Sequence, residues 1–82
     1  MNGENKIKVI KEIAKIDTSN NGRLSWYALM LKEGQYGEFL SLERTGVGMR
    51  SKYITLPIRP DQLQAIGQSL VDYAKEIEEG NQ

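Results

Sequence analysis

The sequence predicts a small, mostly β domain of the α+β class that is closed by one C-terminal helix. Over residues 60–79, apolar side chains recur at three- and four-residue steps behind a proline, which is typical of an amphipathic helix. Upstream of it, short apolar runs are separated by turns that contain glycine and asparagine, which is typical of antiparallel hairpins. The chain has 82 residues, which is enough for a single domain over residues 1–82 and too few for two.

The first of these runs, residues 7–17, fits two structures. Ile7, Ile10, Ile13 and Ile16 recur every third residue, which suits an amphipathic helix. The same isoleucines together with Val9 suit a strand equally well, with a β-bulge near Val9 to keep the apolar residues in line. The local pattern therefore leaves helix and strand open.

Three further strands are predicted at about residues 23–33, 37–44 and 51–57. The turn before the first of them contains Asn21 and Gly22, a pair that adopts the positive φ angles of a tight hairpin connection. Residues 33–37 form the second turn, and residues 45–50 form a glycine-bearing loop. Pro57 ends the last strand because proline cannot donate a hydrogen bond to a β ladder.

The composition excludes several classes of protein. Without cysteine or histidine the chain has neither disulfides nor the usual zinc and haem ligands, so we expect no metal and no cofactor. The remaining acids and bases are scattered or lie on the outer face of the helix, so we expect no enzymatic activity. The apolar runs are too short to span a membrane, and residues 1–8 lack the apolar stretch of a signal peptide. We therefore expect a soluble protein of the cytoplasm or the nucleoid.

The net charge is zero, but the charges are unevenly distributed. Residues 1–22 carry +1, residues 23–59 carry +3 and residues 60–82 carry −4. A basic middle and an acidic C-terminal segment can lie on different faces of the fold, which leaves one face attractive to phosphates. Gly46 and Gly48 lack the further glycines and the following helix of a phosphate-binding loop, so we interpret residues 45–50 as a hairpin loop flanked by cations.

The middle strands are apolar on both faces, which is unusual for a sheet with one side in water. If the helix covers one face, the side chains that point away from it are Trp26, Met30, Phe39, Ser41, Tyr53 and Thr55. An uncovered aromatic face edged by arginine and lysine is typical of surfaces on which single-stranded bases stack. A large apolar patch is equally typical of a subunit interface. The residues alone leave both interpretations open.

Several short motifs occur in a fixed order between Tyr27 and Tyr73. YALMLKEGQYG is an aromatic strand that runs into a turn and a glycine, and it is followed by GEFL, by a loop with glycine and arginine, and by RSK and ITLP. An amphipathic helix with a late tyrosine completes the order. This order resembles the PUR repeat of the purine-rich-element-binding proteins. It is also similar, more loosely, to the single-stranded-DNA-binding domain of transcriptional positive coactivators and to the Whirly proteins.

The resemblance implies a ββββα fold, in which a curved four-stranded antiparallel sheet is backed by the C-terminal helix and residues 7–17 are the first strand. It implies an intertwined homodimer for a chain with a single repeat, which agrees with the marginal core expected at this length. It also implies binding of single-stranded DNA or RNA through the sheet face and its loops. The family's contacts fall on Trp26, Met30, Phe39, Ser41 and Tyr53, with Lys32, Arg44, Arg50 and Lys52 as phosphate partners.

Two hypotheses follow from these observations. The first is a non-catalytic homodimer that binds single-stranded DNA or RNA. The second is a protein-interaction module on the same fold, whose aromatic face docks a protein and which has no physiological nucleic-acid binding. The first is the preferred hypothesis. PUR repeats often carry a basic residue where Ser41 stands and a polar one where Met30 stands, and this departure, with the zero net charge, keeps the second hypothesis open.

Overall fold

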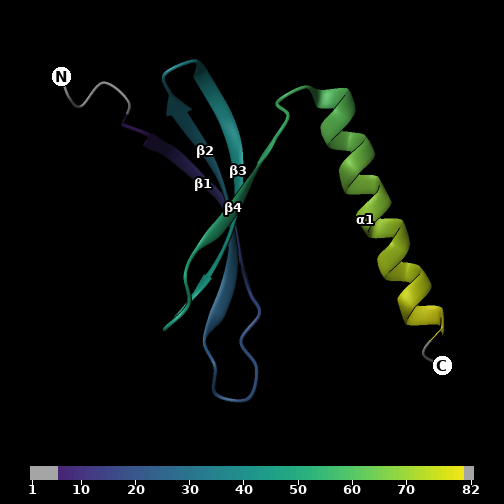
Figure 1. Cartoon of the computed structure of the whole chain (residues 1–82). Coiled ribbons are helices and arrows are strands. Elements are labelled where there is room, and N and C mark those ends of the chain that lie inside the picture. The colour runs from purple at the N-terminus through teal and green to yellow at the C-terminus, as the bar shows by residue number, and fades with distance from the viewer. Residues whose placement is uncertain (1–5, 81–82) are drawn as a thin grey trace.

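A computed structural model of the chain describes residues 6–80, and Figure 1 shows a sheet followed by a helix. The elements are the strands β1 (Lys8–Asp17), β2 (Ser25–Gly34), β3 (Gly37–Gly46) and β4 (Lys52–Leu56) and the helix α1 (Pro60–Gly80). Within the described residues the strands form one antiparallel sheet in the order β1-β2-β3-β4. The ββββα arrangement of the α+β class is therefore confirmed. Residues 1–5 and 81–82 of the domain expected over residues 1–82 lie outside the described range.

The segment that fitted either a helix or a strand is the edge strand β1. Its register against β2 shifts between Val9 and Lys11, which is the bulge expected near Val9, and shifts again between Glu12 and Ala14. Each bulge inserts one extra residue into the strand. Two bulges three residues apart turn a period of two into a local period of three, which explains how isoleucines at helical spacing belong to a strand.

The connection between β1 and β2 is the predicted tight turn. Asn21 and Gly22 have φ angles of 51° and 79°, values that asparagine and glycine tolerate better than other residues. Around them, Asn20 and Arg23 exchange two backbone hydrogen bonds of 3.0 and 2.9 Å. The turn fixes the register of β1 on β2, and this register decides which side chains of the two strands share a face.

The ladder register divides the sheet into two faces, because residues paired across neighbouring strands point to the same side. The first, which we call the Trp26 face, includes Val9, Glu12, Lys15, Asp17, Trp26, Ala28, Met30, Lys32, Phe39, Ser41, Glu43, Thr45, Tyr53 and Thr55. The second, the Leu29 face, includes Ala14, Ile16, Tyr27, Leu29, Leu31, Leu40, Leu42, Arg44, Lys52, Ile54 and Leu56. Alternation along β2 and β3 therefore separates the apolar residues as predicted.

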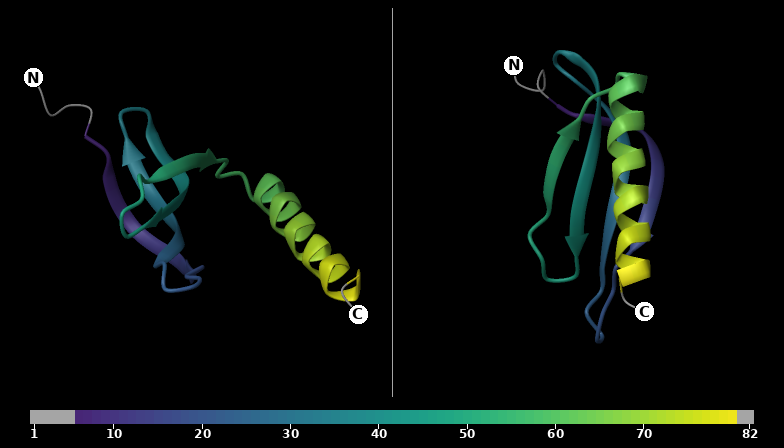
Figure 2. Two further views of the ribbon diagram at one scale, coloured as in Figure 1. Left: turned by 60° about the horizontal axis from the view of Figure 1, so that its bottom comes forward. Right: turned by 90° about the vertical axis from the view of Figure 1, so that its right-hand side faces the viewer.

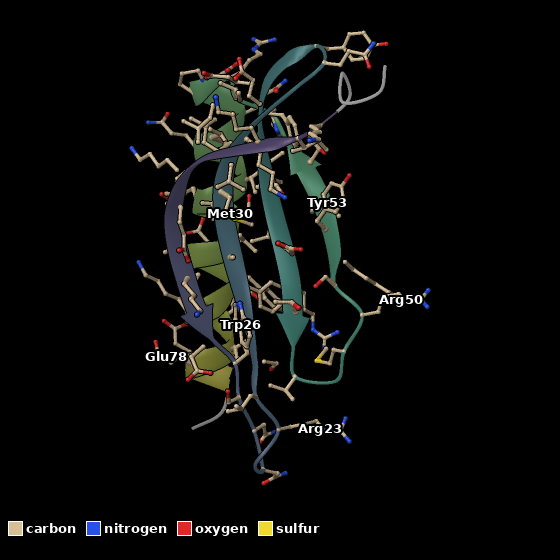
Figure 3. All side chains as sticks on the ribbon, turned by 90° about the vertical axis from the view of Figure 1, so that its left-hand side faces the viewer. Arg23, Trp26, Met30, Arg50, Tyr53 and Glu78 are labelled. Carbon is tan, nitrogen blue, oxygen red and sulfur yellow. The ribbon has the colours of Figure 1, made fainter. Side chains whose placement is uncertain are left out.

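The helix α1 stands apart from the sheet (Figures 1 and 2) and does not pack against it. It lies on the side opposite to Trp26, Met30 and Tyr53, which is the side of the Leu29 face (Figure 3). None of its 21 residues is buried, and Leu70, Tyr73 and Ile77 of its apolar stripe are 68%, 61% and 49% exposed. The helix begins at the predicted residue, but the expectation that it covers the sheet of its own chain differs from the structure. The connector of residues 57–59 is short and is bounded by Pro57 and Pro60, whose rings fix φ and limit how far the chain can turn back.

The chain by itself has little core. Ala28 and Leu40 are the buried apolar residues of the part that the structure describes. The chain exposes 6765 Å², whereas a compact monomer of 9.3 kDa exposes about 5,000 Å². Its radius of gyration is 15.7 Å, against about 12 Å for a compact chain of this length. Exposed large apolar residues of the described chain include Ile16 and Ile54 on the Leu29 face and Leu70 and Ile77 on the helix stripe.

Candidate functional site

Aromatic side chains from three strands gather on the Trp26 face. Trp26 and Met30 stand on β2, Phe39 on β3 and Tyr53 on β4. Figure 3 looks onto this face, with Trp26, Met30 and Tyr53 toward the viewer and α1 passing behind the sheet. Trp26, Met30 and Phe39 are half-buried, and Tyr53 is 54% exposed. The structure therefore brings these four predicted site residues together on a face that α1 does not cover.

An ammonium group lies over each of two rings on this face. Lys15 Nζ is 4.7 Å from the centroid of the Trp26 ring, and Lys32 Nζ is 5.2 Å from the centroid of the Tyr53 ring. Both distances allow cation–π attraction. The sequence predicts Lys32 as a site residue but gives no reason to choose Lys15, because the face of residues 7–17 depends on the bulges. The pairing of β1 with β2 places Lys15 on this face, since Lys15 pairs with Ala28 and Asp17 pairs with Trp26.

Ser41, which the family resemblance assigns as a contact residue, is not accessible. It is 0% exposed, and among the described residues its hydroxyl has no hydrogen-bond partner. Ser41 lies in the cross-strand row of Met30 and Thr55, and the Lys32 side chain must cross this row to reach the Tyr53 ring. A direct contact between Ser41 and a ligand is therefore excluded in this conformation.

The predicted phosphate partners do not share one surface. Lys32 belongs to the Trp26 face, whereas Arg44 pairs with Tyr27 and Lys52 and therefore points, with Lys52, to the Leu29 face. Arg50 is exposed in the loop between β3 and β4 (Figure 3). The sequence groups these cations because they are close along the chain, but alternation along β3 sends Arg44 to the same side as Leu42. The basic residues thus surround the sheet instead of lining one face.

A polar pocket of about 370 Å³ lies at the end of the sheet that carries the β1–β2 turn. Arg23 and Arg44 contribute two guanidinium groups to it, beside Thr18, Asn20 and Ser25. The sequence does not predict this grouping, because Arg23 and Arg44 become neighbours only through the pairing of β2 with β3.

The Trp26 face also carries carboxylates. Glu12, Asp17 and Glu43 share it with Lys15 and Lys32, so the face itself is not basic. The Oδ1 atom of Asp17 accepts a hydrogen bond of 2.8 Å from the backbone N–H of Ser19. Hydrogen bonding by the side chain and the backbone of Ser19, with help from the charge of Lys15, lowers the pKa of the Asp17 carboxyl below its ordinary 3.8. Asp17 is therefore ionised at neutral pH.

Beside Asp17, an open pocket of about 290 Å³ lies on the Trp26 face. It is lined by Lys15, Asp17 and Ser19 from the β1 side and by Leu24 and Trp26 from the β2 side. A third pocket, of about 320 Å³, lies around the turn between β2 and β3 and includes Phe39 and Tyr36. The described residues contain no group of three or more histidine, cysteine, aspartate or glutamate side chains that could hold a metal ion. The helix of the described range is also not apolar enough to cross a membrane.

No protein-family model matches the chain, and comparison with curated proteins and with solved structures finds no match either. The functional interpretation therefore depends on the residues of this chain and on their geometry.

Proposed function

We propose that the protein binds single-stranded DNA or RNA on the Trp26 face, without catalysis, in the cytoplasm or on the nucleoid. The observation that carries this proposal is the pairing of rings and ammonium groups on one uncovered face, with Lys15 over Trp26 and Lys32 over Tyr53. Single strands bind such surfaces because bases stack on aromatic rings while cations contact the phosphates. Both kinds of group are adjacent here.

In the proposed complex a base replaces the ammonium group above each ring, and the displaced lysine turns to a neighbouring phosphate. Lysine permits this movement because its ammonium ends a flexible four-carbon stem. Stacking contributes about 1–3 kcal/mol per base, which is more than the roughly 0.5–1 kcal/mol of an exposed cation–π contact. The exchange is therefore favourable for the ring and for the lysine.

The remaining site residues have supporting roles in this proposal. Met30 and Phe39 extend the apolar floor from the row of Tyr53 toward the turn between β2 and β3. Arg50 is exposed in the loop that leads into the strand of Tyr53 and can follow the phosphates of a strand bound there. Arg44 and Lys52 can contact the bound nucleic acid only where it passes around the edge of the sheet, because both residues belong to the Leu29 face.

Membership of the PUR type is the finer form of the same proposal. It is supported by the order of sequence motifs between Tyr27 and Tyr73 and by the four antiparallel strands that precede one helix within residues 6–80. The helix belongs to the acidic C-terminal segment, and Glu78 on it lies beyond the sheet in the view of Figure 3. Like charge on that side disfavours nucleic acid there and leaves the Trp26 face as the binding surface.

A second copy of the chain is the proposed partner for the uncovered apolar surfaces. Each chain exposes about 1,800 Å² more than a compact monomer of its mass, and a standard interface buries roughly 800 Å² per partner. The helix stripe and the Leu29 face are both apolar and are displaced from one another in one chain (Figure 1). An intertwined homodimer, in which the helix of one copy covers the sheet of the other, buries both and leaves each Trp26 face open.

Titration of the single tryptophan tests the binding proposal directly. We expect single-stranded oligonucleotides to quench Trp26 fluorescence at low salt, and duplex of equal length to quench it less. Log K should fall linearly with log salt by about 0.7 for each phosphate contact. Absence of binding to any single strand at low salt would contradict the proposal.

Two variants assign the salt dependence to the lysines over the rings. Lys15→Gln and Lys32→Gln should each reduce the slope by about 0.7, because each removes one phosphate contact. Lys75→Gln is the matched control, since Lys75 is an exposed lysine on α1. An equal change of slope for Lys75→Gln would show that total charge, and not the Trp26 face, controls binding.

A protein partner on the Trp26 face is the second candidate function. The specific observation in its favour is the set of carboxylates, Glu12, Asp17 and Glu43, which outnumber Lys15 and Lys32 on the sheet face. Carboxylates repel phosphates but suit a basic or mixed protein surface. In that case Trp26→Ala abolishes capture of a protein partner, while the unmodified protein fails to bind any single strand.

A further inference from the structure

The pocket beside Trp26 has the elements of a site for one base. Lys15 and Asp17 end β1 and Ser19 follows two residues later, while Leu24 directly precedes β2 and Trp26 lies at its start. The pairing of Asp17 with Trp26 brings the two rows to the same face. The pocket therefore offers an aromatic plane, an aliphatic wall, a cation and an acceptor within one open space of about 290 Å³.

The acceptor is held in place at one atom. Asp17 Oδ1 accepts the 2.8 Å hydrogen bond from the Ser19 backbone N–H. The Ser19 hydroxyl accepts a bond of 3.2 Å from the Ser25 backbone N–H, which fixes Ser19 to the neighbouring strand. The carboxylate is thereby oriented by a turn that spans β1 and β2, and its remaining lone pairs are available because Asp17 is exposed.

An ionised carboxylate on a surface that binds phosphates has a cost, because it repels them. It has a use only toward the part of the ligand that donates hydrogen bonds. In a single strand that part is the Watson–Crick edge of a base, and an aspartate accepts from exocyclic amines such as cytosine N4. Uracil carries an oxygen at the same position, and this oxygen would face the carboxylate without a proton between them. Uracil could offer the carboxylate only its N3–H, and only after the ring shifts in the pocket.

We infer that this pocket holds one base stacked on Trp26 and selects a base with an exocyclic amine, with Asp17 as the acceptor. The inference rests on the proposed function, because it deepens the choice of ligand at the same face. Lys15 leaves the ring when the base enters and turns to the phosphate of the same nucleotide. Leu24 contributes an aliphatic side chain to the wall of the pocket.

Cytosine and uracil are the sharpest probes, because they have the same ring and differ at the exocyclic group. The experiment measures the affinity of the full-length protein for oligodeoxycytidine and oligodeoxyuridine of eight nucleotides at pH 8, where cytosine is neutral. We expect the cytosine strand to bind roughly three- to tenfold more tightly, the range for one partly exposed hydrogen bond to a charged acceptor. Homopolymers make the register of the strand on the protein irrelevant.

Asp17→Asn assigns the preference to the carboxylate. Asparagine retains the oxygen that Ser19 bonds, and its amide can accept from cytosine or donate to uracil, so the ratio of the two affinities should fall to within about twofold. Glu12→Gln is the control, because it removes the same charge from the same face and strand outside the pocket. It should strengthen binding of both strands and keep their ratio.

The outcomes separate the inference from the proposed function. Equal affinity of the unmodified protein for the two strands overturns the inference and leaves single-strand binding intact. A preference for cytosine that persists in Asp17→Asn overturns the assignment to this pocket. Failure of both strands to bind overturns the proposed function, and the inference with it.

Discussion

The two faces of the sheet are built from the same strands but differ in the kind of side chain that they leave exposed. The Leu29 face is mainly aliphatic, apart from the row of Tyr27, Arg44 and Lys52, and Ile16 and Ile54 on it are 52% and 59% exposed. The Trp26 face mixes rings with charges, and its lysines lie over its rings. An aliphatic face gains most from another aliphatic surface, whereas a ring with a cation over it gains from a flat ligand that carries negative charge.

Each face of the sheet therefore suits a different kind of partner. The helix, which the sequence predicts as the cover of the sheet, has the apolar stripe that the Leu29 face needs but does not reach it within one chain. The Trp26 face is less in need of such a cover, since lysine ammonium groups already lie over the rings of Trp26 and Tyr53. In the proposed function, the second copy therefore belongs on the Leu29 face and the nucleic acid on the Trp26 face.

A charge placed on the apolar stripe of the helix should change stability the most, and it tests whether a second copy covers the Leu29 face. Leu70 is 68% exposed in one chain, so Leu70→Glu costs little if the chain is a monomer. In the intertwined homodimer the same change removes a buried leucine and places a charge in an apolar interface, at a cost of about 3 kcal/mol or more. We expect a lower urea midpoint and dissociation in light scattering.

Gln64→Glu is the control for this variant, because it adds the same charge to the same helix outside the apolar stripe. It should leave the midpoint and the mass unchanged. A stable monomer of 9.3 kDa for the unmodified protein, with Leu70→Glu as stable as Gln64→Glu, would remove the second copy from the Leu29 face.

The next effect concerns the Trp26 face. Trp26→Ala should weaken binding of single strands roughly five- to 150-fold, which corresponds to the loss of about 1–3 kcal/mol of stacking. Tyr36→Ala is the matched control, because Tyr36 is 94% exposed in the turn between β2 and β3 and belongs to neither face. The measurement is fluorescence anisotropy of a labelled strand. If Tyr36→Ala weakens binding as much as Trp26→Ala, the Trp26 face is not the surface on which the bases stack.

The sequence predicts the elements of the fold well, because their signals are local. Alternation along β2 and β3, the Asn21–Gly22 turn and the stripe of α1 each depend on neighbouring residues alone. Residues 7–17 are ambiguous because bulges change the period of a strand, and bulges are set by pairing with β2. The place of α1 is missed for a similar reason, since an amphipathic stripe shows that a helix needs an apolar partner but does not say in which chain.

The site is predicted in part. The rings of Trp26, Phe39 and Tyr53 share a face because alternation fixes them. Lys15 and Asp17 are missed, because their face follows from the bulges and not from the sequence period. Gly46 is a further example: the sequence predicts it in the loop of residues 45–50, but it ends β3, where a Cβ atom would collide with the backbone oxygen of Leu24.

A smaller change in the free energy of unfolding is expected at Ser41, which lies between the rings of the Trp26 face. A buried hydroxyl without a hydrogen-bond partner is destabilising, so Ser41→Ala should raise the free energy of unfolding by about 1 kcal/mol and leave affinity for single strands unchanged. Thr55→Ala in the same cross-strand row is the control, because Thr55 is exposed. Loss of affinity in Ser41→Ala would return Ser41 to the binding site, from which its 0% exposure removes it.

The smallest effect is a pH dependence at the edge of the Trp26 face. Folding lowers the pKa of Asp17 below 3.8, so the ionised form is favoured by the native turn. Its contribution to stability is therefore fully present above pH 3.8 and is lost as the pH falls through the lower pKa of the folded state. Asp17→Asn keeps the acceptor for the Ser19 N–H but cannot titrate.

Urea unfolding of Asp17→Asn and of the unmodified protein from pH 7 downward isolates this contribution. The difference between their free energies of unfolding should stay constant down to about pH 4 and then change in favour of Asp17→Asn, because only the unmodified protein loses a charge that its turn stabilises. A difference that already changes near neutral pH would mean that Asp17 is not held ionised by Ser19. Asp17, the acceptor proposed for the base beside Trp26, would then lack its fixed charge. The Trp26 face would lose the group by which it is proposed to distinguish bases, and with it the clearest difference from the Leu29 face.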